Sequence, residues 1–164
     1  MALIKGTEVV SDDGFRSIAD DQPLPERGDV LISLARLQSE GVPSARQGKL
    51  GVRLEPEDDI GQLVPHLAKV DLVAIDFPKF ADGRGYSKAR LLRERYGFKG
   101  ELRAVGEVLA DQLFYMRRCG FDAYELVDGK DVAAALRGLK DFSVTYQAAT
   151  DEPRPLYRRV HRGA

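Results

Sequence analysis

The sequence of 164 residues has few of the residues from which disulfides and many metal centres are built. It contains one cysteine, Cys119, and two histidines. A single cysteine excludes a disulfide within the chain, four-cysteine iron–sulfur ligation and a cysteine-rich zinc site. Proteins without disulfides are typical of a reducing compartment, so we expect a cytoplasmic protein.

Long apolar runs and an excess of charge of one sign are also absent. No stretch approaches the roughly 20 apolar residues that a membrane-spanning helix needs. The start, MALIKGTEVV, has no basic segment followed by a long apolar run, so we expect no signal peptide. The formal net charge is -1. We therefore expect neither nucleic acid nor a membrane surface as a partner.

The residues that are present suit one folded domain. The composition is 43% hydrophobic and 31% charged, which is ordinary for a globular protein. The length suits a single domain with a real core, which we place at residues 1–148. Residues 149–164 contain Pro153 and Pro155 and a basic end, and they are predicted to form a C-terminal tail.

The N-terminal residues predict a β-hairpin followed by a linker. Apolar residues within 3–10 and 15–18 flank the sequence Ser11-Asp12-Asp13-Gly14, and glycine after aspartate permits the positive φ of such turns. We place the hairpin at residues 1–19. Residues 20–28 are polar and contain two prolines, so they are predicted to be a surface linker.

The middle of the chain alternates between strand and helix patterns. Strands are predicted at residues 49–55, 71–77, 101–105 and 121–127, with residues 29–37 forming a short strand that passes into a helical turn. Helices are predicted at residues 58–68, 87–96, 107–119 and 131–139, with Ser87 and Asp131 as caps of the second and fourth. Pro65 should kink or split the first. Residues 142–146 alternate and suggest an edge strand.

This alternation predicts the fold class. Strands separated by helices and short loops become parallel neighbours through right-handed crossovers. We therefore predict a single α/β domain with an open, mostly parallel sheet of repeated β-α units and an N-terminal β-hairpin. A partial (β/α) barrel is the alternative. In either architecture, functional side chains are expected at the carboxyl ends of the strands.

Asp76 is the most unusual residue at that edge. It lies between Ile75 and Phe77 in an apolar strand, where a carboxylate must be paired or hydrogen-bonded. It is a candidate general base. The alternative is a structural carboxylate that pairs with loop amides, Arg84 or Arg103.

The loop after this strand opens a helix and is predicted to bind an oxyanion. Backbone amides at a helix start, with Arg84 and Ser87, suit sulfite, sulfate or a phosphate group. The predicted anion-binding residues of this loop are Lys79, Asp82, Arg84, Tyr86 and Ser87. The alternative is a glycine-rich turn in which Arg84 pairs with Asp76 or Asp82. The glycines match only part of GxGxxG, so no dinucleotide site and no cofactor are predicted.

Arg103, Glu107 and Asp111 form the second candidate group. Arg103 interrupts an apolar strand, and Glu107 and Asp111 stand four residues apart, where two like charges call for a nearby cation. We predict that Arg103 and Asp111 help to bind a small polar ligand and that Glu107 is, with Asp76, a candidate acid or base. The alternative for the carboxylates is complementarity to the helix dipole. No metal site is predicted.

Two segments resemble one protein family. Residues 77–87 (FPKFADGRGYS) and 100–121 (GELRAVGEVLADQLFYMRRCGF) look like the signature of the bacterial DUF934 family, and the likeness is strong over residues 51–121. The family is of unknown function, is usually encoded with genes of sulfite reduction and cysteine biosynthesis, and carries the label of an oxidoreductase of sulfite reduction.

The resemblance implies an accessory protein of assimilatory sulfite reduction that acts with sulfite reductase or its electron donor. With one cysteine, the chain cannot itself be the haem and iron–sulfur reductase subunit. A small enzyme or binding protein for a sulfur oxyanion or phosphorylated metabolite is the second hypothesis. A structural or regulatory α/β module without catalysis is the third.

Overall fold

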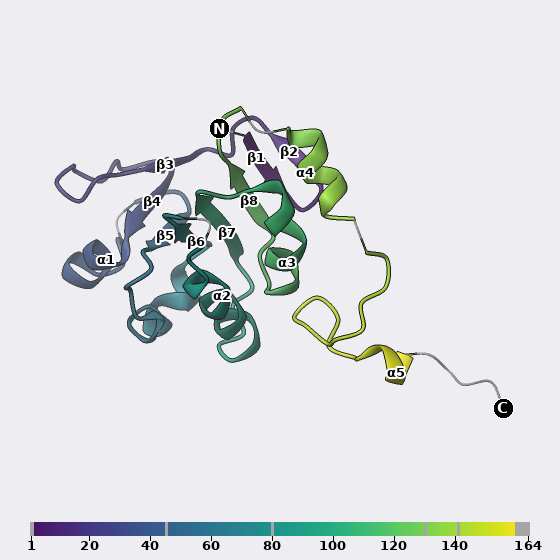
Figure 1. Ribbon diagram of the computed structural model, residues 1–164. Helices are drawn as coiled ribbons and strands as arrows, with labels where there is room; N and C mark the ends of the chain where they lie inside the picture. Colours follow the sequence, from purple (N-terminus) through teal and green to yellow (C-terminus); the bar gives the residue numbers. More distant parts are fainter. Residues whose placement is uncertain (1, 45, 80, 130, 141, 160–164) are drawn as a thin grey trace.

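The computed structural model describes residues 2–44, 46–79, 81–129, 131–140 and 142–159. Eight strands form one sheet in the order β2-β1-β8-β7-β6-β5-β4-β3 (Figure 1). They are β1 (Ala2–Lys5), β2 (Glu8–Val10), β3 (Phe15–Ser17), β4 (Asp29–Ser33), β5 (Leu50–Leu54), β6 (Leu72–Phe77), β7 (Glu101–Gly106) and β8 (Ala123–Leu126). Strands β3 to β8 are mutually parallel, whereas β1 runs antiparallel to β8 and to β2.

Helices lie between most of the parallel strands, and the last two α-helices follow the last strand. The α-helices are α1 (Leu34–Glu40), α2 (Arg84–Glu94), α3 (Leu113–Arg118), α4 (Val132–Gly138) and α5 (Leu156–Arg159), and the 3₁₀ helices are η1 (Ile60–Gln62), η2 (Val64–Lys69) and η3 (Ala110–Gln112). Because β3 to β8 follow one another in chain order, every crossover steps in the same direction, which places the connecting helices on one face of the sheet (Figure 1). None of the helices in the described ranges combines the length and apolar character that a bilayer crossing requires.

The sheet is strongly curled. Its two edge strands, β2 and β3, are joined by the short segment from Val10 to Phe15. Five residues span at most about 18 Å, whereas eight strands side by side in a flat sheet span roughly 33 Å. The edges therefore approach each other, and the sheet is an open half-barrel. The predicted fold class is confirmed, and the partial barrel that stood as its alternative describes the curvature.

Side chains on the two faces of the sheet differ. The main core lies between the sheet and the helices and includes Val52, Ile75 and Phe77. The concave face carries a small second cluster of Leu72, Ala74 and Val105, with Phe15 and Leu31 packed against it. All six residues of β6 are buried, as the near-continuous apolar run predicts.

Helix α2 lies very close to the sheet because of Gly85. A Cβ atom at this position would lie 2.6 Å from the Phe77 ring. Phe77 in turn packs edge-on against Tyr86 at 5.2 Å between ring centroids. Gly85 therefore allows helix α2 to approach the strand closely.

The N-terminal hairpin is present, but its predicted turn is wrong. Strand β1 pairs with β2, with Leu3 opposite Val10 and Lys5 opposite Glu8. Gly6, with φ of 59°, supplies the left-handed residue of that turn. The side chain of Asp12 accepts a hydrogen bond from Gly14 N at 2.8 Å, which makes a local turn that directs the chain across to the other edge.

Several predicted helix boundaries are also wrong. Helix α2 begins at Arg84, so Ser87 lies exposed in its first turn and is not its cap. The helix predicted at 107–119 starts only at η3 because Leu109 is extended. The one predicted at 58–68 is two 3₁₀ helices, so its type is wrong, but the expected split at Pro65 is confirmed, since Pro65 lies in the first turn of the second. Residues 142–146 form no strand.

Two other predictions of local structure are confirmed. Residues 29–37 form strand β4 followed directly by helix α1. The carboxylate of Asp131 caps α4 by accepting a hydrogen bond from Ala134 N.

Candidate functional site

The carboxyl edge of β5 and β6 brings together a buried carboxylate and a cation. Asp76 is only 6% exposed, and its Oδ1 accepts a hydrogen bond from Nη2 of Arg53 at 2.6 Å. Arg53 pairs in register with Ala74, two residues before Asp76, so both side chains face the concave side. Arg53 is therefore the partner that the buried carboxylate required, in place of Arg84 or Arg103.

Glu55 extends this pair into a group of three. Its Oε1 lies 3.1 Å from Nε of Arg53. Burial raises the pKa of Glu55; Arg53 opposes this effect, while the negative charges of Asp76 and Asp58 add to it. A carboxyl group with raised proton affinity beside a second carboxylate and a cation is suited to give a proton to a ligand or take one from it.

Lys88 fixes the loop that follows Glu55. Its ammonium group donates to the carbonyl oxygens of Glu55 at 2.7 Å and Asp58 at 2.6 Å. Burial lowers the pKa of Lys88. These bonds fasten helix α2 to the carboxyl end of β5, so the Arg53, Glu55 and Asp76 group is positioned by regular elements on both sides.

Glu55→Gln is expected to raise the unfolding temperature slightly at pH 7. The folded-state pKa of Glu55 lies above its ordinary value, so folding favours the protonated form, and this contribution is lost as pH rises through the folded pKa. Gln mimics the protonated form at every pH. Because Glu55 is half exposed, we expect the unfolding temperature to rise by only about 1 °C. Thermal unfolding at pH 7 and pH 3.5 tests this: the difference should vanish at pH 3.5, and a less stable variant at pH 7 would contradict it.

Arg84 is engaged by two carboxylates. Its Nη2 lies 2.6 Å from Asp82 and its Nη1 lies 3.0 Å from Glu57. The guanidinium lowers the pKa of Asp82 to about 2. The loop is thus a glycine-rich turn with an Arg84–Asp82 pair, which was the alternative to an anion site. Lys79, Asp82 and Arg84 still line a shallow pocket of about 510 Å³, so anion binding there stays a prediction.

Arg103 belongs to a different ionic network. It lies on the concave face, where its guanidinium donates to Asp13 and, at 2.6 Å and 2.8 Å, to Glu101. Lys5 pairs with the same carboxylates at 3.0 Å and 2.8 Å. The ring of Phe15 covers the guanidinium at 5.7 Å. Burial raises the pKa of Asp13, but the bonds from Lys5 and Arg103 outweigh it and hold that pKa below its ordinary value.

The remaining predicted residues lie around this edge. Glu107 and Asp111 are exposed, and the extended conformation of Leu109 between them removes the helical spacing that the sequence suggested. Tyr86 is half buried between Phe77 and Tyr115. Over the described ranges, no three His, Cys, Asp or Glu residues are grouped as metal ligands would be.

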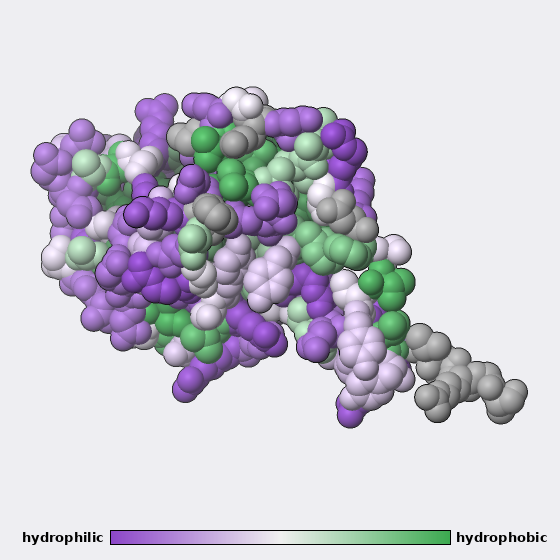
Figure 2. Space-filling model, in the orientation of Figure 1, coloured by the Kyte–Doolittle hydropathy of each residue, from purple (hydrophilic) through white to green (hydrophobic). Residues whose placement is uncertain are grey.

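A second feature lies on the C-terminal segment. Five of the seven exposed large hydrophobic side chains in the described ranges gather there or beside it, and we call them the C-terminal surface: Tyr115, Phe142, Val144, Tyr146 and Tyr157. Tyr146 and Tyr157 are 67% and 66% exposed. Figure 2 shows hydrophobic and pale side chains in this region, at the lower right where Figure 1 places α5.

Arg118 holds this irregular segment in place. The side chain is buried at the end of α3 and donates to Thr145 Oγ1 at 2.8 Å, Asp151 Oδ1 at 3.1 Å and the carbonyl of Gln147. Phe142 packs on Phe114 of α3 with ring centroids 5.0 Å apart. The first part of the predicted tail, residues 149–159, is therefore attached to the domain, and residues 160–164 lie outside the described residues.

Arg53 and the C-terminal surface are the two features that sequence reasoning missed. Arg53 alternates with apolar neighbours in β5, so its side chain could be assigned to the polar face of that strand, but its contact with Asp76 needs the register of β5 and β6. The sequence pattern assigned Phe142 and Tyr146 to an edge strand and Tyr157 to a tail.

Comparisons with known proteins give one match. A family model described as a bacterial protein of unknown function (DUF934) matches residues 51–157. The matched range runs from β5 into α5, so it contains the Arg53, Glu55 and Asp76 group as well as the C-terminal surface. No curated protein and no solved structure matches the chain.

Proposed function

We propose that this chain, which belongs to the DUF934 family of bacterial proteins of unknown function, is a cytoplasmic accessory protein of assimilatory sulfite reduction that docks on sulfite reductase or its electron donor. The observation that carries the docking is the C-terminal surface. Clustered exposed apolar side chains mark interaction surfaces, and tyrosine and arginine are enriched among the residues that dominate binding energy. The pathway follows from the family resemblance.

The charge around the C-terminal surface favours an acidic partner. Arg117 lies over the Phe114 ring at 5.4 Å, and Arg158 lies over the Tyr157 ring at 5.8 Å. Arg154 is 71% exposed. Asp151, a carboxylate of the same segment, is already engaged by Arg118. The surface therefore suits a protein with an apolar recess for the tyrosine rings and an acidic rim for the arginines.

The double substitution Tyr146→Ser/Tyr157→Ser is expected to weaken partner binding at least tenfold. Both rings are exposed, so their loss should leave the fold intact, and losing two binding residues of more than about 1 kcal/mol each gives an effect of this size. The measurement is binding to purified sulfite reductase and to its native electron donor, together with sulfite-dependent turnover with and without the protein.

The control is Val9→Ser, which removes a similarly exposed side chain from strand β2, remote from the segment in sequence. It should bind like the wild type. Binding should also weaken as salt rises, since the acidic rim contributes. No binding to either pathway protein, or equal loss in both variants, would overturn the proposal.

A second candidate function rests on Arg53. Its side chain is 40% exposed although Nη2 is bound to Asp76 and Nε lies against Glu55. It can bind the oxyanion of a sulfur or phosphorylated metabolite while Glu55 and Asp76 handle a proton. In this case the chain would be a small enzyme or binding protein.

Arg53→Gln distinguishes this candidate from the loop site predicted at Arg84. If the anion binds at β5, sulfite or sulfate should raise the unfolding temperature of the wild type and of Arg84→Ala by several degrees, and this shift should disappear in Arg53→Gln. If the anion binds at the loop, the shift should disappear in Arg84→Ala and persist in Arg53→Gln. Thermal unfolding at constant ionic strength measures it, and the absence of any anion-specific shift would exclude both sites.

A further inference from the structure

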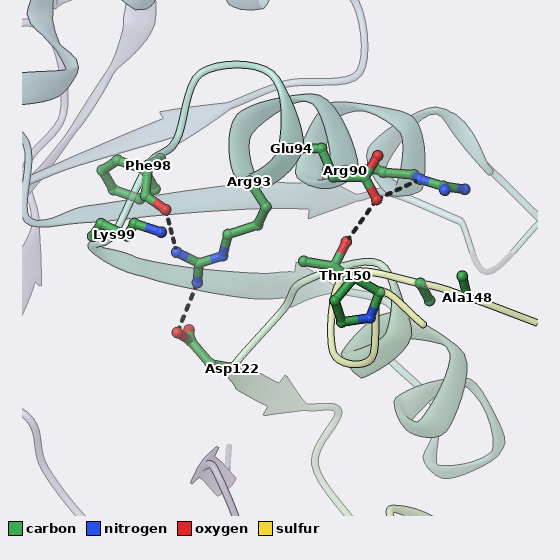
Figure 3. A pocket seen from close by; sticks show the side chains of 10 residues that line it. Arg90, Arg93, Glu94, Phe98, Lys99, Asp122, Ala148 and Thr150 are labelled. Carbon is green, nitrogen blue, oxygen red and sulfur yellow. Dashed lines mark hydrogen bonds and ion pairs between the residues drawn. The ribbon is translucent and has the colours of Figure 1, made fainter. Parts of the chain in front are cut away.

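A pocket lies beneath the C-terminal segment, at the amino ends of β7 and β8. Its volume is about 570 Å³, within the range of small-molecule sites. Four parts of the chain form it: α2, the turn before β7, the residue before β8, and the C-terminal segment. They contribute Arg90, Arg93 and Glu94; Lys99; Asp122; and Ala148, Ala149, Thr150 and Pro153. Figure 3 shows Lys99 on one side of Arg93, with Arg90 and Thr150 on the other.

Arg93 gives the pocket a rigid floor. Its Nε donates to Gly120 O at 2.9 Å, and its Nη1 donates to the carbonyls of Phe98 and Gly100 at 2.8 Å each. Its Nη2 pairs with Asp122 at 2.7 Å. Four hydrogen bonds to two chain segments, 98–100 and 120–122, fix the guanidinium, so the floor exists before any ligand arrives.

The carboxylates of the pocket are already engaged. Asp122 accepts from Leu102 N at 2.8 Å through Oδ1 and from Arg93 through Oδ2. Glu94 Oε1 accepts from Arg90 Nε at 2.9 Å and from Thr150 Oγ1 at 3.3 Å. Both carboxylates are therefore already paired with arginines of the pocket.

The unused polar groups are donors that carry positive charge. Lys99 is exposed and makes no ion pair within the part of the chain that the structure describes, and across the same residues Arg90 donates through Nε alone. The pocket has three cations, Arg90, Arg93 and Lys99, against two carboxylates, Glu94 and Asp122. Complementarity requires a ligand that supplies acceptors and negative charge.

We infer that this pocket binds a small organic anion, such as one bearing a carboxylate, sulfate or phosphate group, between Lys99 and Arg90.

Thr150 forms part of its wall, and Thr150 N donates to Arg118 O at 3.1 Å. The same segment carries Tyr146, which accepts from Leu156 N at 3.0 Å. A bound anion thus contacts α2 and the C-terminal segment together and favours the attached conformation of the C-terminal surface. This last step rests on the proposed docking function; the pocket does not.

Titration followed by ¹H–¹⁵N NMR tests the pocket without any partner protein. The probes are sulfate and pyrophosphate, each added at constant ionic strength against chloride. We expect saturable shifts of the Lys99 and Thr150 amides, and an affinity at least tenfold lower in Lys99→Gln. Lys69→Gln, an exposed lysine outside the pocket, should bind like the wild type. No saturable shift with either probe, or equal binding by Lys99→Gln, overturns the inference.

Limited trypsin digestion tests the coupling. Cleavage after Lys140 and Arg158 reports release of the segment, whereas Arg154 precedes Pro155 and resists cleavage. Saturating pyrophosphate should slow cleavage about fivefold or more in the wild type and leave Lys99→Gln unchanged. Unchanged cleavage despite anion binding would refute the coupling but not the inference that the pocket binds an anion. Failure of the protein to bind a pathway protein would count against the proposed function alone.

Discussion

Replacing Arg103 with methionine is expected to lower the free energy of unfolding by about 3 kcal/mol. Asp13 and Glu101 would then share Lys5 as their remaining cation, on a face that Phe15 covers. Removing one partner from a buried ionic group leaves the other charges poorly solvated, and this cost exceeds that of losing a surface pair. The unfolding temperature of a domain of this size should fall by roughly 6–12 °C.

Arg84→Met is the matched control. Arg84 also binds two carboxylates, but it is 52% exposed, so its loss should change stability by less than about 1 kcal/mol. Urea unfolding of both variants at pH 7 gives the comparison. Equal losses of stability would contradict the conclusion that Arg103 is buried and Arg84 is exposed.

The cost of Arg103→Met should also depend on pH. The folded pKa of Asp13 is depressed, so the stabilisation by ionised Asp13 is present above its unfolded pKa and is lost as pH falls through the folded pKa. The difference between the variant and the wild type should therefore shrink below about pH 4.

Phe77→Ala is expected to cost about 4 kcal/mol and to lower the unfolding temperature by roughly 8–16 °C. The ring is fully buried. It packs on Tyr86 at 5.2 Å and on Phe121 at 5.8 Å between centroids, and it lies against Gly85 of helix α2. Its removal leaves a cavity between the central strand and the helix that follows it, beside Asp76. Thermal and urea unfolding measure the loss.

Two further variants separate this cavity from a general effect of losing an aromatic ring. Phe142→Ala makes the same chemical change at a position that is 61% exposed, and it should cost less than about 1 kcal/mol. Gly85→Ala should destabilise the wild type, because its Cβ would lie 2.6 Å from the Phe77 ring, but it should stabilise Phe77→Ala. Additive effects of the two substitutions would mean that Gly85 and Phe77 are not in contact.

The sequence predicted the parts of the fold that local patterns encode. The apolar run of β6 required a strand buried on both faces, and Asp131 identified the start of α4. The curl of the sheet could be given only as an alternative, a partial barrel, because it depends on β3 joining the edge opposite β2. Asp12 and Asp13 near Gly14 gave a strong hairpin signal, yet their side chains make local turns and an ion pair instead.

The candidate site was partly predictable for a related reason. The isolated Asp76 in an apolar strand correctly indicated a paired carboxylate, whereas its partner depends on the register between two strands. Arg103 and Asp13 are 90 residues apart in the sequence, so no local pattern relates them. The alternation of residues 142–146 resembles a strand, but Arg118 holds that segment through side-chain bonds in an irregular conformation.

The antiparallel pairing of β1 with β8 has a consequence for how the chain is assembled on the ribosome. Ala2 pairs with Leu126, whereas each strand from β3 to β8 pairs with the one just before or after it. The β-α units can therefore add one after another as they emerge, with short loops to close at each step. The β1–β2 hairpin is synthesised before these units but must wait for β8, and until then its apolar side chains are open to other nascent chains and to chaperones.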